Sequence, residues 1–178
     1  MTAHTDHPAD PARHPELLAW LDERRRAFPS WAENTGHAGR LDFAPASLGV
    51  LDHLVRQTAG SSEQITTDRL TPFIQGAVWY VGEVFCHHKG MVWKYQADAD
   101  YGYAPLFARE NRTSILDTPC VGLPDDEPDR GLYPLNMLRR LLIDEDEMGM
   151  PVDATLPSIF EAPYDDEDGE GEEDEEEA

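Results

Sequence analysis

The stretch FIQGAVWYVGEVFCHHKGMVWKY, residues 73–95, decides the fold of this 178-residue chain. Its apolar residues recur at helical spacing and cover almost the whole circumference, which is typical of a central buried helix. Thr67 or Asp68 can cap the start of this helix, and Gly90 can take the left-handed conformation that ends one. Residues 91–95 then read as a strand. The pattern predicts a long helix followed directly by a strand.

Further helical and extended patterns flank this stretch and predict an α+β fold. We expect three N-terminal helices including the central one, a small antiparallel sheet of two to four strands, and a C-terminal helix packed on the sheet. The other predicted elements are a helix that begins near Pro15 and ends at Pro29, a helix over residues 45–59, short strands over residues 113–118 and 120–123, and a helix that begins at Pro134.

Length and charge divide the chain into one domain and two arms. A chain of this length fits one domain, which we expect over residues 14–163. Residues 1–13 are polar and proline-containing, so they predict a disordered arm. Residues 164–178 predict a disordered acidic tail. Eleven acids and no base lie in this tail, so it holds half of the formal net charge of −22.

The charge of the chain excludes some classes of partner and favours others. Direct binding to nucleic acid and to anionic membranes is disfavoured, because phosphates would be repelled. A basic protein partner is favoured. No apolar run reaches the roughly 20 residues of a membrane span, and no secretory signal pattern is present, so we expect a cytoplasmic protein. A DNA mimic is an alternative that requires acids at regular spacing on an ordered face.

Glu83 is the one carboxylate in the middle of the predicted central helix. A buried carboxylate must be paired or hydrogen-bonded. It is therefore either a structural group, bonded to strand backbone or to an arginine such as Arg140, or the general base of a small enzyme. We favour the structural role. Gly76 and Gly82 in the same helix indicate that another backbone comes close to it.

Cysteine and histidine residues near the end of this helix have the types of side chain that bind zinc. The candidates are Cys86, His87, His88 and Cys120. Adjacent helical residues point about 100° apart, and no spaced C-x2-C pair is present, so we predict no metal and no cofactor. A cysteine nucleophile in a small enzyme would need a lowered pKa and a nearby base, and no catalytic signature supports one.

Aromatic and arginine residues gather in and after the predicted strand, with the composition of a protein-binding surface. We predict a partner-binding patch made of Trp93, Tyr95, Tyr101, Tyr103, Phe107, Arg109 and Arg112. The alternative is that about half of these side chains cover the sheet as core.

Several of these positions together support a family resemblance. They are Gly76, Ala77, Tyr80, Gly82, Glu83, Val84, Phe85, Lys89, Gly90, Trp93, Tyr133, Pro134, Leu135, Met137 and Arg140. On these residues the chain resembles a group of small bacterial, actinobacterial-type α+β domains of unknown function, which are similar to immunity-type accessory proteins. The resemblance covers about residues 70–145. It implies the fold and a binding role, and it carries over no catalytic residue.

These observations predict a non-enzymatic, cytoplasmic accessory protein that binds a basic protein partner through acidic surface and the aromatic patch. Electrostatic steering would then speed association and make it sensitive to salt. Stopped-flow association rates at rising ionic strength test this expectation. A rate that does not change with salt would contradict it.

Overall fold

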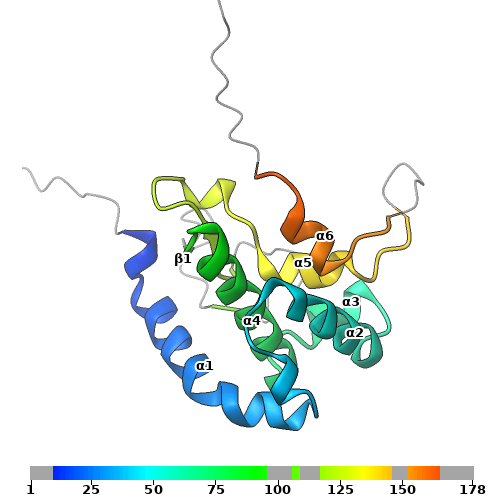
Figure 1. The fold of residues 1–178 in the computed structure, drawn as a ribbon. Helices are drawn as coiled ribbons and strands as arrows, with labels where there is room; N and C mark the ends of the chain where they lie inside the picture. Colours follow the sequence, from blue (N-terminus) through cyan, green and yellow to red (C-terminus); the bar gives the residue numbers. More distant parts are fainter. Residues whose placement is uncertain (1–9, 96–105, 109–116, 146–151, 165–178) are drawn as a thin grey trace, which may run out of the picture.

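The computed structural model describes residues 10–95, 106–108, 117–145 and 152–164, and its fold is α+β as predicted (Figure 1). The 3-10 turns are η1 (Pro11–Arg13), η2 (Ala38–Arg40), η3 (Pro45–Ser47) and η5 (Pro128–Arg130). The helices are α1 (Pro15–Asn34), α2 (Leu48–Thr58), α3 (Ser62–Thr67), α4 (Pro72–Lys89), α5 (Pro134–Arg140) and α6 (Leu156–Glu161), and the strands are β1 (Val92–Lys94) and β2 (Cys120–Gly122).

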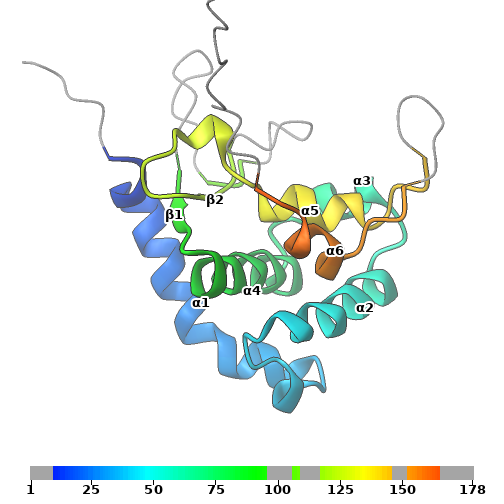
Figure 2. The same cartoon turned by 45° about the horizontal axis from the view of Figure 1, so that its top comes forward.

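Helix α4 lies in the middle of the molecule, with α1 along one side and α2 and α5 on the other (Figure 2). Its side chains are buried nearly all the way round between Ile74 and Phe85, as the sequence pattern predicts. The helix begins at Pro72, later than expected, because α3 ends at Thr67 and is followed by a turn in which the Thr71 amide donates to the carbonyl of Asp68 at 2.8 Å. Thr71 caps α4 by accepting a hydrogen bond from the Ile74 amide, with Pro72 in the first turn.

Two glycines of α4 make room for indole rings. A Cβ atom on Gly82 would lie 2.1 Å from the ring of Trp93, and one on Gly76 would lie 2.2 Å from the ring of Trp31. We expected another backbone at these positions, and the structure places tryptophan side chains there. The indoles come closer to the axis of α4 than any residue larger than glycine would permit.

Helix α1 continues through Pro29 to Asn34, although a proline normally ends a helix. Figure 1 shows that α1 curves around the end of α4 in this part of the chain. The extra turn buries Trp31, whose indole nitrogen donates to the carbonyl of Phe73 at 3.2 Å. Burial of an aromatic ring of this size stabilises by about 2–3 kcal/mol, which compares with the roughly 3 kcal/mol that an interior proline costs.

The sheet consists of β1 and β2, paired antiparallel with Trp93 opposite Val121. This pairing agrees with the expected small antiparallel sheet, whereas most of the predicted strand over residues 113–118 lies outside the described residues. Regular structure also begins before the predicted domain boundary at residue 14. Pro11 lies in η1, and its carbonyl accepts a hydrogen bond from the Tyr95 amide at 3.0 Å.

We expect Gly82→Ala to lower the free energy of unfolding by about 1–3 kcal/mol, because the added methyl overlaps the ring of Trp93. Gly49→Ala in α2 is the matched control. Its Cβ meets only Pro157 Cγ at 3.9 Å, so the change is expected to stabilise by up to about 1 kcal/mol. Urea unfolding measures both. Equal effects at the two sites would contradict the role assigned to Gly82.

Candidate binding pocket

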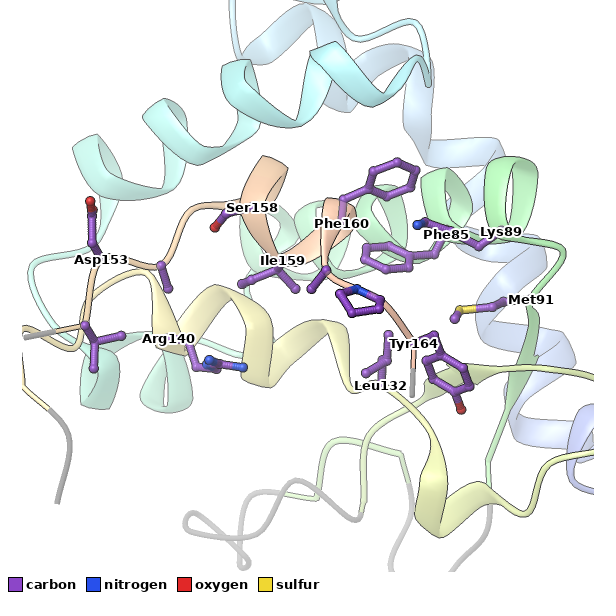
Figure 3. Close-up of a pocket in the computed structure, with 14 residues that line it drawn as sticks. Phe85, Lys89, Met91, Leu132, Arg140, Asp153, Ser158, Ile159, Phe160 and Tyr164 are labelled. Atoms are coloured by element: carbon purple, nitrogen blue, oxygen red, sulfur yellow. The ribbon is translucent and has the colours of Figure 1, made fainter. Parts of the chain in front are cut away.

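A pocket of about 370 Å³ opens where the end of α4, helix α5 and the segment 152–164 meet (Figure 3). Its volume lies in the usual range for small-ligand sites, about 300–1,000 Å³. The lining residues are Phe85, Lys89, Met91, Leu132, Arg140, Val152, Asp153, Ala154, Ser158, Ile159, Phe160, Ala162, Pro163 and Tyr164. The lining is therefore mainly apolar, with a few charged side chains.

Two cations, Lys89 and Arg140, reach this pocket from different helices. The Lys89 ammonium lies 4.8 Å from the ring centroid of Phe160, a distance at which a cation is attracted to the face of the ring. Arg140 is exposed on α5, and its side chain points toward the middle of the pocket (Figure 3). Neither cation forms an ion pair with a carboxylate among the described residues.

Local sequence explains why Lys89 stands at the pocket edge. It occupies the last turn of α4, where the helix dipole favours a positive charge. Gly90 then ends the helix with φ of 68°, in the left-handed region that the sequence predicted for it. One helical turn earlier, the ring of Phe85 packs edge-on against Phe160 with centroids 5.1 Å apart. The aromatic pair thus forms the floor beside the ammonium.

The segment 152–164 forms the opposite wall, and α2 holds it in place. Asp52 accepts a hydrogen bond from the Leu156 amide at 2.9 Å, at the start of α6. Arg56 pairs with Asp52 at 2.7 Å and donates to the carbonyl of Ala154 at 2.7 Å. The hydroxyl of Tyr164 donates to Asp126 at 2.8 Å. These bonds fix both ends of the wall.

The polar side chains of this wall make the two ends of the pocket chemically different. Asp153 lies at one end, well away from Lys89 (Figure 3). Ser158 belongs to the capping box of α6, where its hydroxyl donates to the carbonyl of Thr155 at 2.9 Å and accepts from the Thr155 amide. The serine oxygen is thus used by the helix. A bound anion would lie toward Lys89 and Arg140.

Glu83 lies outside this pocket and has a structural partner. Its Oε1 accepts a hydrogen bond from the indole nitrogen of Trp93 at 2.8 Å, and its Oε2 lies 3.7 Å from Nε2 of His87. The predicted structural role agrees with this geometry, but the partner is a strand side chain. The alternatives of strand backbone and Arg140 as its partner were wrong.

The cysteine and histidine candidates do not come together. His87 faces Glu83, whereas Nε2 of His88 lies 2.9 Å from the carbonyl oxygen of Phe43. Within the described ranges, no group of three His, Cys, Asp or Glu side chains is placed to hold a metal ion. Burial raises the pKa of the Cys86 thiol to about 12 and that of Cys120 to about 11. Both thiols are therefore protonated at neutral pH and are poor nucleophiles.

The described members of the predicted aromatic partner-binding patch are buried, as expected if they cover the sheet as core. Trp93, Tyr95 and Phe107 are only 7%, 1% and 2% exposed. The ring of Trp20 contacts two of them, Trp93 at 5.4 Å and Phe107 at 5.6 Å between centroids. These side chains are core because α1 covers them. The other four members of the patch, Tyr101, Tyr103, Arg109 and Arg112, lie outside the described residues.

Sequence reasoning missed the pocket although two signals were present. The chain has only two lysines, and both fall in or beside the opening stretch. Lys94 is 3% exposed and donates to the carbonyls of Leu123, Pro124 and Asp126, whereas Lys89 reaches the pocket. The second signal is the helical spacing of Leu156, Ile159 and Phe160, in a segment that the apolar pattern places across the body. Neither signal places the two segments side by side.

Comparison with known proteins adds no relative: no family model, no curated protein and no solved structure matches this chain. The resemblance to small bacterial accessory domains therefore stays a prediction. Over the residues that the structure describes, none of the helices combines the length and the apolar character needed to cross a membrane.

The bond between Glu83 and Trp93 predicts different outcomes for two substitutions. Glu83→Gln keeps an oxygen acceptor, so its cost to the free energy of unfolding should stay below about 1 kcal/mol. Glu83→Ala leaves the indole N–H of Trp93 without its partner, and we expect a loss of about 1–3 kcal/mol. Urea unfolding, followed by tryptophan fluorescence, measures both variants. The assignment fails if glutamine and alanine cost the same.

Proposed function

We propose that this chain is a non-enzymatic, cytoplasmic binding protein whose pocket takes an anionic group attached to an apolar body. The observation that carries the proposal is the convergence of Lys89 and Arg140 on a mainly apolar pocket, without a carboxylate partner for either among the described residues. Cations beside apolar surface suit a ligand with a carboxylate, sulfonate or phosphate head and a hydrophobic remainder.

The chemistry of the lining supports binding over catalysis. The enzyme alternative needs Glu83, a histidine or a cysteine in a pocket beside α4, and none of these residues lines this pocket. Ser158 is the serine that lines this pocket, and its hydroxyl already forms the hydrogen bonds of the α6 capping box. A pocket built this way offers charge and apolar contact to a ligand, without a nucleophile paired to a base.

A basic protein partner remains a second candidate, and the formal net charge of −22 favours it. The buried positions of Trp93, Tyr95 and Phe107 remove the described aromatic part of the expected interface. Such a partner would therefore meet acidic side chains on the surface. The salt dependence of the association rate, set out above, is its test.

Anilinonaphthalene sulfonate, an aromatic anion, is a suitable probe for the pocket proposal. We expect the folded, full-length protein to bind the dye. Lys89→Gln and Arg140→Gln should each raise the Kd of the dye about two- to fivefold, because each removes one exposed charge contact with the anion. Arg26→Gln is the matched control. It removes one positive charge on α1, where Arg26 pairs with Asp22, and should leave the Kd unchanged.

Dye fluorescence titration measures these constants, and a thermal melt of each variant shows that it is folded. The proposal is overturned if the native protein does not bind the dye. It is also overturned if the Lys89 and Arg140 variants bind as tightly as the control.

A further inference from the structure

The acidic end of the chain begins at the pocket itself. Tyr164 lines the pocket, and the following residues, 165–178, carry eleven acids and no base. We propose that this acidic segment binds the pocket of its own molecule at Lys89 and Arg140, and competes there with the anionic ligand. The inference rests on the proposed function, because it requires that the pocket accept anions.

Chain length permits the contact. The segment has fourteen residues, and at about 3.3–3.6 Å per extended residue it spans up to roughly 50 Å. Its first residue follows Tyr164 at the pocket wall, so every lining residue is within reach. A short tether holds its end at a local concentration on the order of millimolar. A contact with a Kd of about 1 mM would then be filled about half of the time.

Charge directs the segment to this place and away from the rest of the surface. The part of the chain before the tail carries the other half of the net negative charge, so most of the body repels the tail. Several arginines are already paired with carboxylates, among them Arg24 with Glu23 and Arg56 with Asp52. Lys89 and Arg140 have no such partner among the described residues, and the same holds for Arg25, Arg40 and Arg139. Of these five cations, only Lys89 and Arg140 line the pocket at which the tail begins.

The carboxylate of Asp153 repels the acidic tail and so limits the part of the pocket that the tail can bind. Asp153 lines the pocket at the end away from Lys89 (Figure 3). Like charges repel, so the tail carboxylates should avoid that end. The expected contact is therefore confined to Arg140 and to Lys89, which has the ring of Phe160 beside it.

Carbodiimide cross-linking of the full-length protein tests the contact directly. The reagent activates a carboxylate, the lysine amine attacks it, an amide forms and the reagent leaves as a urea. Lys94 is buried, so Lys89 is the accessible lysine. We expect an amide between Lys89 and an acid of residues 165–177, with a yield that falls at about 0.5 M salt, where screening is strong.

Two variants and an isotope mixture control this experiment. Lys89→Arg keeps the charge but has no amine to couple, so the tail link should disappear. Arg140→Gln should lower its yield. In an equimolar mixture of isotope-labelled and unlabelled protein, a link within one molecule joins peptides of the same label. Links that join differently labelled peptides, or an absence of tail links to Lys89, would overturn the proposal.

Competition is measured with anilinonaphthalene sulfonate on two full-length chains. One is the native chain, and the other carries the amide in place of each of the eleven tail acids. We expect the neutral tail to lower the dye Kd at least about twofold at low salt, and less at high salt. Equal dye affinity for both chains overturns the tail contact and leaves the proposed function standing. A dye that binds neither chain overturns the proposed function itself.

Discussion

The indole of Trp93 joins the sheet to the central helix, and the remaining structure depends on that joint. Its ring fills the space left by the missing side chain of Gly82, and its N–H donates to Glu83 in the next position of α4. A glycine and a carboxylate side by side in a buried helix each carry a cost. The ring and its hydrogen bond offset both, so three residues are explained by one contact.

From β1, which Trp93 holds on α4, a series of hydrogen bonds leads to the wall of the pocket. Lys94 follows Trp93 in β1, and its ammonium donates to the carbonyls of Leu123 and Asp126. The carboxylate of Asp126 accepts from Tyr164, which ends the pocket wall. The other end of that wall is held from α2 by Asp52 and Arg56. The pocket therefore lies between two anchors that depend on different helices.

Local signals in the sequence predicted those parts of the fold that local forces decide. Residues 73–95 contain apolar residues at helical spacing, the glycine that ends the helix and the strand that follows it. The centre of the α+β fold could therefore be predicted from the sequence. Pro29 lies inside α1 against the local rule, because the burial of Trp31 and its hydrogen bond to Phe73 offset the cost of an interior proline. The pocket depends on contacts such as Asp52 with Leu156, 104 residues apart. No periodicity in the sequence encodes a pairing at that separation.

Composition also failed to separate an aromatic core from an aromatic surface. Trp93 and Phe107 have the residue types of an interface, but α1 brings Trp20 over them and excludes solvent. The positions of the two pocket cations, Lys89 and Arg140, have different explanations. Lys89 is favoured at the end of α4 by the helix dipole, which explains a positive charge there without any ligand. The dipole does not explain why Arg140 of α5 reaches the same pocket, and this convergence is the feature that points to an anion.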